Sequence, residues 1–488
     1  MTVPTVPLEA ALAAHARVGA CWLRGGELLD AAQTSSYAPP ALGGTRISSG
    51  DVTASDALAA AELAAAAQAS WGSTPALHRA AYVRALAVEL ENTRETLAEA
   101  IVLDSGKTIA NARAEVELCL RVLDTLLGSI AELGAPARTD YLTGKRVVTV
   151  LRPVGTALLM TPWNFPLNLG VRKLATALLA GCTVLWKPSD RAPLAAMIVA
   201  EATTRIGLPA GVVSVLPTSD SEGVVGALLS SGLVRKLSFT GSTEVGKQLM
   251  RQAADQLLRT SFELGGNGAA IVAASADVET VADAVMRAKF GSNGQVCTTI
   301  NRLYVAREIA PELVEALRTR MDALTVGWPQ EASTDLGPVI TPESVARLEG
   351  IVDRAARAGA TVTVHGTPVP QDGNFVRPTL VTDTETDSEI CQQELFGPVL
   401  PVIVFDDLDD AISQANATPY GLSAYVFADR AAEVERLLAG IRSGLVAVNS
   451  PSPSSVSTPF GGIGWSGIGR ENGIRGLMEF LDEVSHVY

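Results

Sequence analysis

The fold class follows from the stretch Thr156–Asp190, which reads TALLMTPWNFPLNLGVRKLATALLAGCTVLWKPSD. It opens with a short apolar run at 156–160 that predicts a strand, and residues 169–179 predict a helix. A second strand is predicted at 182–186, directly before Lys187. Strand, helix and strand in succession form the repeating unit of a parallel sheet. The sequence therefore predicts an α/β fold.

The same alternation continues towards the C-terminus. Further strands are expected at 212–216 and 235–239, and a second alternating stretch runs from about 263 to 447. Residues 52–136 are helical in character, and Gly106 predicts a helix end within them. This pattern predicts two α/β domains.

Two segments outside this alternation predict a small additional sheet. Residues 145–151, KRVVTVL, are β-branched and alternate in polarity, which is typical of a half-exposed strand. The last residues, 483–488, predict one more strand.

Length and charge limit the classes of function. The 488 residues correspond to two or three domains, and 47% hydrophobic with 18% charged residues is a globular composition. The net charge is 38 − 52 = −14. A polyanion would meet net repulsion, so neither nucleic acid nor an anionic membrane is an expected partner.

Cysteine and histidine usage predicts neither a disulfide framework nor a metal site. The five cysteines are widely spaced without a CxxC pair, and the four histidines are scattered. The N-terminus has no signal-peptide pattern, and the 19-residue uncharged run between Arg152 and Arg172 contains three prolines. We therefore expect a cytoplasmic protein without a membrane span.

Polar segments follow three of the expected strands, at 161–166 (TPWNFP), 187–190 (KPSD) and 241–246 (GSTEVG). Ligands of parallel sheets bind beyond the carboxyl ends of the strands. A helix N-terminus after Gly241 suits a phosphate, and Lys187 with Asp190 could hold a ribose. Each feature alone is common; together they favour a nucleotide.

A second glycine pattern is misleading. Residues 462–467, GIGWSG, match GxGxxG, but only 21 residues follow, too few to complete a βαβ unit. We interpret this segment as a turn-rich loop.

Cys297 and Glu263 are candidates for chemistry. Cys297 follows the polar, glycine-containing segment GSNGQ, unlike a core strand, and a thiol needs a base or a helix end to become reactive. Glu263 ends an apolar segment, where a carboxyl can have a raised pKa and act as a base. Inert packing for the cysteine and an ordinary ion pair for the glutamate are the alternatives.

Together these segments resemble the NAD(P)-dependent aldehyde dehydrogenase superfamily over nearly the whole chain. The separation of Glu263 and Cys297, 297 − 263 = 34 residues, matches the family. The motifs occur in the family order: TPWNFP (161–166), KPSD (187–190), FTGSTEVG (239–246), ELGG (263–266), GQVC (294–297), ELFGP (394–398) and PFGG with SGIGRENG (459–473).

The resemblance implies a Rossmann-like dinucleotide-binding domain, an α/β catalytic domain and a small β extension for oligomerisation. The expected boundaries are 1–136 and 154–262 for the cofactor domain and 263–474 for the catalytic domain. Residues 137–153 and 475–488 would pair between subunits of a homodimer or homotetramer.

The resemblance also implies the reaction. Cys297 would attack the aldehyde carbon, and the oxyanion would lie between the Asn164 amide and the Cys297 backbone N–H. A thioester would remain on Cys297, and water activated by Glu263 would hydrolyse it. The implied cofactor is NAD, with NADP as the alternative, and no metal is needed.

The resemblance carries further residues into the site. An acidic residue three positions after Lys187 favours NAD, whereas Thr218 and Gly464 depart from the family pattern. The implied cofactor contacts are Met160, Thr161, Trp163, Lys187, Asp190, Phe239, Gly241, Ser242, Val245, Leu264, Glu394 and Phe396.

The substrate stays open at this point. The implied tunnel residues are Phe165, Asn168, Arg172, Thr298 and Phe460. Arg172 occupies the place where semialdehyde dehydrogenases bind the substrate carboxylate, but Gly291 replaces a second arginine of succinate semialdehyde enzymes. Either a small anionic aldehyde or an aromatic or medium-chain aldehyde fits, and Arg172 could instead form a structural salt bridge.

Two other functions compete. A CoA-acylating enzyme would usually lack the base, whereas Glu263 is present. A non-catalytic structural protein on this fold would tolerate the loss of Cys297, Glu263 or Asn164, and all three remain.

Overall fold

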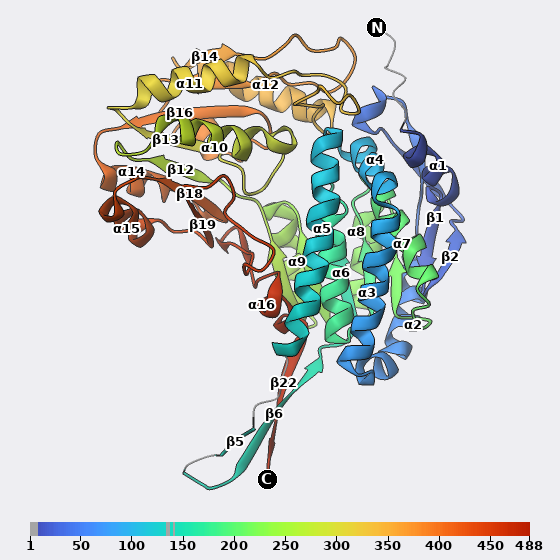
Figure 1. Ribbon diagram of the computed structural model, residues 1–488. Helices are drawn as coiled ribbons and strands as arrows, with labels where there is room; N and C mark the ends of the chain where they lie inside the picture. The colour runs from blue at the N-terminus through green and yellow to red at the C-terminus, as the bar shows by residue number, and fades with distance from the viewer. Residues whose placement is uncertain (1–7, 133–136, 140–141) are drawn as a thin grey trace.

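The computed structural model describes residues 8–132, 137–139 and 142–488. Two large sheets carry helices on their faces, and a narrow arm of strands projects from the body (Figure 1). This is the predicted α/β class.

The first sheet has eight strands in the order β2-β1-β9-β8-β7-β10-β11-β21. Its five central strands are parallel. Four of them, β7, β8, β9 and β10, were predicted from the sequence, and β11 was not. The antiparallel edges β1, β2 and β21 were not predicted from the sequence. The strands are β1 (Cys21–Arg24), β2 (Glu27–Asp30), β7 (Ala157–Met160), β8 (Val184–Lys187), β9 (Val213–Val215), β10 (Lys236–Thr240), β11 (Arg259–Glu263) and β21 (Gly467–Ile468).

Helices cover both faces of this sheet (Figure 1). The helical character predicted for 52–136 is confirmed over the described residues, and Gly106 ends α4 in a left-handed conformation. The helices are α1 (Glu9–Val18), α2 (Ala54–Ser73), α3 (Ala76–Asn92), α4 (Arg94–Ser105), α5 (Ile109–Ser129), α6 (Asn168–Ala180), α7 (Leu194–Arg205), α8 (Ser221–Ser230) and α9 (Thr243–Ala254).

The second sheet has seven strands in the order β14-β15-β16-β13-β12-β18-β19, of which only β14 runs antiparallel to its neighbour. The strands are β12 (Ala269–Val272), β13 (Arg302–Ala306), β14 (Thr361–Val364), β15 (Thr379–Thr382), β16 (Val399–Phe405), β18 (Ser423–Phe427) and β19 (Leu445–Val448). The main helices are α10 (Val278–Phe290), α11 (Ala310–Asp322), α12 (Pro342–Arg357), α14 (Leu408–Ala415) and α15 (Ala431–Gly440).

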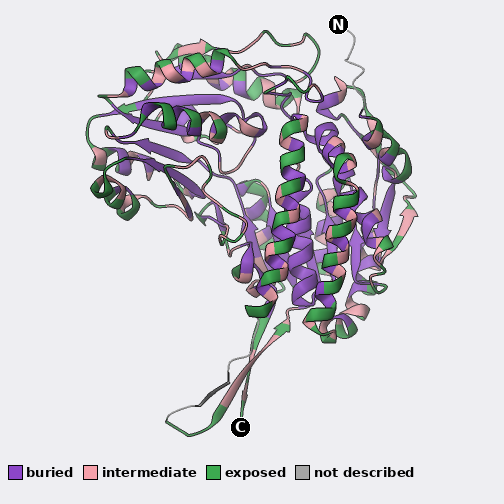
Figure 2. Cartoon of the chain, in the orientation of Figure 1, coloured by how far each residue is buried: buried purple, intermediate pink, exposed green. Residues whose placement is uncertain are grey.

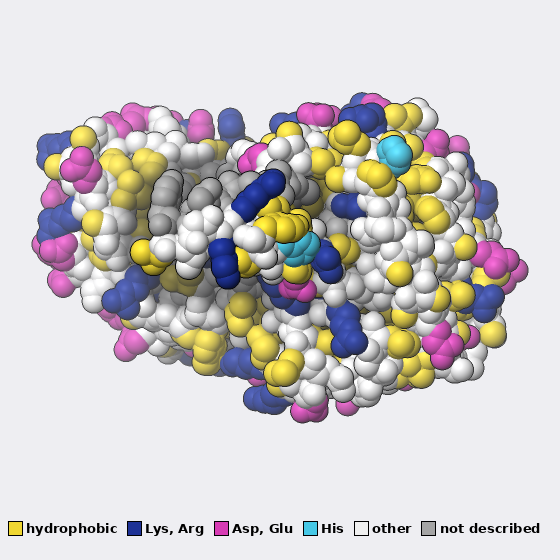
Figure 3. Space-filling view, turned by 90° about the horizontal axis from the view of Figure 1, so that it is seen from below, with side chains coloured by type: hydrophobic (Ala, Val, Ile, Leu, Met, Phe, Trp, Pro, Cys, Tyr) yellow, Lys and Arg dark blue, Asp and Glu magenta, His cyan; other side chains and the backbone are white. Residues whose placement is uncertain are grey.

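The arm is a three-stranded antiparallel sheet of β5 (Ala137–Thr139), β6 (Arg146–Pro153) and β22 (Leu481–Val487). The two strands predicted from the sequence, at 145–151 and 483–488, correspond to β6 and β22. Their pairing joins Leu481 to Pro153 and Val487 to Val147. Seen from below, hydrophobic, basic and histidine side chains lie together near the centre of this face (Figure 3).

Helix α6 packs closely against the first sheet. Every residue of α6 is buried, and most residues of the strands beneath it are buried too (Figure 2). A Cβ at Gly170 would lie 2.0 Å from the Trp186 ring, so only glycine permits this approach of α6 to β8. No helix in the described ranges is long and apolar enough to cross a membrane.

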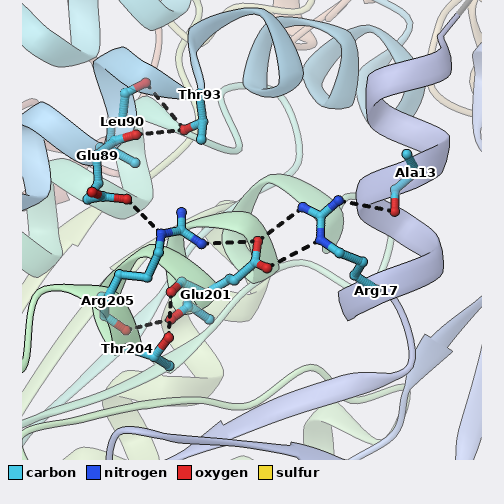
Figure 4. Close-up of polar contacts among 10 residues, drawn as sticks. Ala13, Arg17, Glu89, Leu90, Thr93, Glu201, Thr204 and Arg205 are labelled. Atoms are coloured by element: carbon cyan, nitrogen blue, oxygen red, sulfur yellow. Dashed lines mark hydrogen bonds and ion pairs between the residues drawn. The ribbon is translucent and has the colours of Figure 1, made fainter.

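A charged network connects the N-terminal helix to the body (Figure 4). The Glu201 carboxylate of α7 accepts a hydrogen bond from the Arg17 guanidinium of α1 at 3.2 Å, and it lies 3.6 Å from the Arg205 guanidinium. Arg205 also forms an ion pair with Glu89 of α3 at 2.6 Å. Because these groups are partly solvated, each pair is worth only about 0–1 kcal/mol, so the network orients α1 more than it stabilises the fold.

Candidate active site

A cavity of about 170 Å³ lies between α5, α6, the ends of β10 and β11, and the loop that carries Cys297. Glu263, Cys297 and all five predicted tunnel residues line it. The complete lining is Leu118, Val122, Phe165, Asn168, Leu169, Arg172, Thr240, Glu263, Val296, Cys297, Thr298, Ser452, Ser454, Ser455, Val456, Phe460 and Asn472.

A left-handed turn precedes Cys297. Ser292, Asn293 and Gly294 have φ values of 51°, 58° and 71°, which are costly for the two residues with side chains. Asn293 holds the turn: its Nδ2 donates to the Gly106 and Pro338 carbonyls at 3.0 Å, and its Oδ1 accepts the Gly337 N–H at 2.8 Å. The conformation of the nucleophile loop is therefore set by buried hydrogen bonds.

The thiol of Cys297 is protonated at neutral pH in this arrangement. Loss of hydration raises its pKa to about 12, with Glu394 and Glu263 adding repulsion for a thiolate. Attack on a substrate therefore needs removal of the thiol proton by a nearby base.

Glu263 lines the same cavity as Cys297 and is a candidate base for water. It is the last residue of β11, is buried, and its Oε2 has no hydrogen-bond partner among the described residues. Desolvation raises its pKa well above the usual range, and the charge of Glu471 raises it further. A carboxyl with a raised pKa is a stronger base than an ordinary one once it is ionised.

A charged cluster lies beside this base. Glu471 pairs with Arg172 Nε at 3.0 Å and with the ammonium of Lys173, which also donates to Ser238 Oγ at 3.0 Å. Desolvation opposes ionisation of Glu471, but Lys173 and Arg172 outweigh it and lower its pKa. The surroundings therefore favour the anionic form of Glu471 and the protonated form of Glu263.

Asn164 lies at the nucleophile loop. Its side chain is buried and its Nδ2 donates to the Gln295 carbonyl at 3.0 Å, two residues before Cys297. The neighbouring Trp163 ring packs edge-on against Phe396 at 5.4 Å between centroids. Phe396 has a φ of 50°, an uncommon conformation for a bulky residue.

A second cavity, of about 540 Å³, lies between α8 and α9 at the ends of the parallel strands. Beside it, Ser242 caps α9 by accepting the Val245 N–H at 3.4 Å. Buried Lys187 ends β8, where desolvation lowers its pKa and Asp190 opposes that shift. The cavity is lined by Met160, Ser221, Glu222, Val225, Val245, Gln248, Leu249, Arg251 and Gln252.

The polar and apolar parts of this second site fit a dinucleotide. A helix N-terminus suits the pyrophosphate, a lysine suits a ribose, and the apolar slot between helices suits an adenine. A Cβ at Gly241 would lie 2.4 Å from the Phe239 ring, so a side chain there would displace it.

Glu394 contacts the two glycines that follow β11. Its Oε1 accepts the Gly266 N–H at 2.9 Å, and a Cβ at Gly265 would lie 2.7 Å from its Oε2. Desolvation raises its pKa to about 7. Both glycines after Leu264 are therefore needed for this carboxyl to approach the end of β11.

The aldehyde dehydrogenase family model matches residues 30–486. The chain belongs to the aldehyde dehydrogenase family. It therefore catalyses the oxidation of an aldehyde to a carboxylic acid with NAD or NADP.

This aldehyde dehydrogenase is similar to several characterised relatives. It is 39% identical to a succinate-semialdehyde dehydrogenase of Paenarthrobacter nicotinovorans, covering 88% of this chain and 95% of that protein. It is 35% identical to an NADP-dependent succinate-semialdehyde dehydrogenase of Escherichia coli, covering 94% and 95%. Betaine aldehyde dehydrogenase of Staphylococcus aureus, solved with NAD, superposes with a TM-score of 0.94 at 31% identity, covering 98% and 97%.

One interpretation of the aldehyde dehydrogenase sequence needs correction. Residues 462–467 are not only turns: β20 (Ile463–Gly464) pairs with β17 (Tyr420–Gly421), and β21 pairs with β11. This segment thereby closes the sheet next to Glu263, because the Leu264 N–H donates to the Ser466 carbonyl at 2.9 Å.

The structure shows what surrounds Gly464 and Thr218, the two residues that depart from the family pattern. Gly464 has a φ of 60°, and a Cβ there would lie 2.6 Å from the Pro419 carbonyl oxygen, which excludes a lysine in this conformation. Thr218 is buried, and its hydroxyl donates to the Val52 carbonyl at 2.9 Å. That hydroxyl therefore holds the segment before α2.

Sequence reasoning missed several functional neighbours. Lys173 and Glu471 were not identified, although a lysine inside an apolar helix is itself a signal of a buried partner. The serines that line the substrate cavity carry no spacing signal, because the chain brings them there through a long loop.

Proposed function

We propose that this aldehyde dehydrogenase oxidises a small aldehyde that carries a carboxylate. The observation that carries the proposal is Arg172, a buried guanidinium on the lining of the substrate cavity. Asn472 and the hydroxyl-bearing Ser452, Ser454 and Ser455 lie on the same lining. Relatives named as succinate-semialdehyde dehydrogenases support this substrate class.

Arg172 serves two partners in this proposal. Its Nε faces Glu471 at 3.0 Å and its Nη1 donates to Asn472 Oδ1 at 3.2 Å. A guanidinium has five N–H donors, so donors remain for a bidentate carboxylate. The ion pair that a structural role requires is thus compatible with substrate binding.

The catalytic sequence uses three side chains. Cys297 Sγ attacks the aldehyde carbon after its proton is removed, and the Asn164 amide with the Cys297 N–H stabilises the oxyanion. A nicotinamide cofactor, when bound, would accept the hydride that leaves the thiohemiacetal carbon, and a thioester would remain on Cys297. Glu263 then takes a proton from a water that attacks the thioester carbonyl, which releases the acid and the free thiol.

Water rather than CoA is the acyl acceptor in this proposal. The buried carboxyl of Glu263 lines the same cavity as Cys297 and has a raised pKa through desolvation, as a base for water requires.

We propose that the cofactor binds in and beside the cavity between α8 and α9. Met160 and Val245 line its apolar part, Gly241 and Ser242 would hold the pyrophosphate, and Lys187 the adenosine ribose. We propose that NAD is preferred, because the Asp190 carboxylate near Lys187 would repel a 2′-phosphate. The remaining contacts, Thr161, Trp163, Phe239, Leu264, Glu394 and Phe396, lie around the same strand ends.

Replacing Arg172 with alanine should raise KM for a carboxylated aldehyde about 30-fold or more, equivalent to about 2 kcal/mol for one lost buried charge contact. KM for a neutral aldehyde of matched length should change by less than about threefold, because Glu471 keeps its pair with Lys173. Initial rates measured by reduced-cofactor absorbance test this. Equal effects on both aldehydes would instead assign an aromatic or medium-chain substrate to the apolar lining.

We also propose the domain division 1–136 with 154–262, 263–474, and 137–153 with 475–488. The arm supports assembly as a homodimer or homotetramer, because β22 is an edge strand whose Val487 is 58% exposed. Free thiols at all five cysteines, which lie in the described ranges, support a cytoplasmic location.

The Val487→Glu variant should therefore shift the protein towards monomer, seen as at least a twofold loss of mass in light scattering. Val364→Glu, on the exposed edge strand β14 of the other sheet, is the matched control and should keep the native mass. An unchanged mass for Val487→Glu would remove the arm from the interface.

A further inference from the structure

We propose that a buried ion pair, Lys107 with Glu115, positions the loop that carries the oxyanion amide. This inference rests on the roles proposed above for Cys297 and Asn164. The pair lies at the start of α5, and no chemical step passes through it. Lys107 and Glu115 are positioning residues in this proposal.

The Glu115 carboxylate reaches three donors at once. Its Oε2 accepts Lys107 Nζ at 2.6 Å, and its Oε1 accepts the N–H groups of Leu167 and Asn168, each at 3.1 Å. Both ionic groups are buried, with 2% of the Lys107 and none of the Glu115 side chain exposed. Their mutual pairing is what allows two charges to stay in the interior.

This carboxylate caps α6 from another helix. Leu167 is the residue before α6 and offers no side-chain cap of its own. The first N–H groups of a helix otherwise lack partners, and a negative charge there interacts favourably with the helix dipole. Glu115 therefore fixes where α6 begins and where the preceding loop ends.

Lys107 contacts the loop before α6 at Phe165, two residues before Leu167. Its Nζ lies 3.3 Å from the centroid of the Phe165 ring, within the range of a cation–π contact. Asn164 directly precedes Phe165, so the amide that would bind the oxyanion is flanked by a residue fixed against the ammonium.

Gly106, the residue before Lys107, forms a hydrogen bond with the loop that precedes Cys297. The Gly106 carbonyl accepts Asn293 Nδ2 at 3.0 Å, inside the left-handed turn before Cys297. Gly106 has a φ of 73°, and a Cβ there would lie 2.6 Å from the Pro338 carbonyl oxygen. Consecutive residues at the end of α4 thus locate both catalytic loops relative to each other.

The Glu115→Ala variant tests the proposal. We expect kcat to fall about 10- to 100-fold, because a displacement of about 1 Å at a reacting centre can cost 10²-fold. KM for the aldehyde should change less than threefold. Alkylation of Cys297 by iodoacetamide should also change less than threefold, because this displacement at a saturated carbon forms no oxyanion.

A double variant separates the hydrogen-bond acceptor from the charge. Glu115→Gln with Lys107→Met keeps an oxygen for the Leu167 and Asn168 N–H groups while removing both charges. We expect it to recover kcat severalfold above that of Glu115→Ala but not to the native value, because the variant lacks the contact of Lys107 with the Phe165 ring. Glu115→Gln alone leaves a buried unpaired ammonium and should lie between the two.

Arg79→Met is the matched control. This buried guanidinium of α3 donates to the Leu179 carbonyl at 3.0 Å, at the opposite end of α6. Its loss should lower the melting temperature while leaving kcat within twofold.

Three outcomes would overturn the inference: native kcat in Glu115→Ala, equal losses of kcat and of alkylation rate, or no recovery in the double variant despite a native melting temperature. Failure of the proposed function is distinguishable, since it would show as retained turnover in a Cys297→Ala variant.

Discussion

Replacing Cys297 with alanine is expected to abolish aldehyde oxidation, with kcat falling by a factor of about 10⁶, as for other lost covalent nucleophiles. The reason is chemical: without Sγ no thiohemiacetal forms, and no other described cysteine lines the substrate cavity. Initial rates with NAD and a panel of aldehydes measure the loss.

Cofactor binding should survive this substitution, because the dinucleotide cavity lies between α8 and α9. Fluorescence titration with the reduced cofactor would show an unchanged Kd. Cys21→Ala, on β1 between β2 and β9, is the matched control and should keep native turnover. Turnover within tenfold of native in Cys297→Ala would contradict a covalent mechanism.

Substituting Glu263 with glutamine should lower steady-state turnover by about 10²- to 10⁴-fold, the usual contribution of a general base. If Glu263 serves deacylation, a rapid burst of one reduced-cofactor equivalent per subunit should precede the slow phase. Mass spectrometry of the quenched enzyme would then detect the acyl group on Cys297.

The pH dependence provides a second readout. The carboxylate form is the active base, so native deacylation should increase with pH through the pKa of Glu263, which desolvation has raised above its usual range. In Glu263→Gln this rising limb should disappear. A variant that retained both the limb and the turnover would assign the base to another group.

The central strands could be predicted because each is a short, continuous apolar run followed by a helix. β7, β8, β9 and β10 lie within two residues of their predicted starts and ends. The edges could not be predicted in the same way. β21 has only two residues and exists because Glu263 offers a partner 204 positions earlier, 467 − 263 = 204.

Some residues of the candidate site were predicted from the sequence, and others were not. Motif order brought Cys297, Glu263 and the five tunnel residues to one cavity, as the structure has them. The Arg172–Glu471–Lys173 cluster was missed because Glu471 lies 298 residues after Lys173 and shares no sequence pattern with it. A contact of this kind is a property of the tertiary fold, not of local sequence.

The arm and the edge of the first sheet have a consequence for biosynthesis. β6 pairs with β22 across 481 − 153 = 328 positions. From the same late segment, Phe460 and Asn472 line the cavity and Glu471 pairs with Arg172. Pairing over such separations is slow, and the ribosome delivers these residues well after β7–β11. A nascent chain can therefore fold the helices around β7–β11 early, but it completes the substrate cavity only after Phe460 and Asn472 have been synthesised.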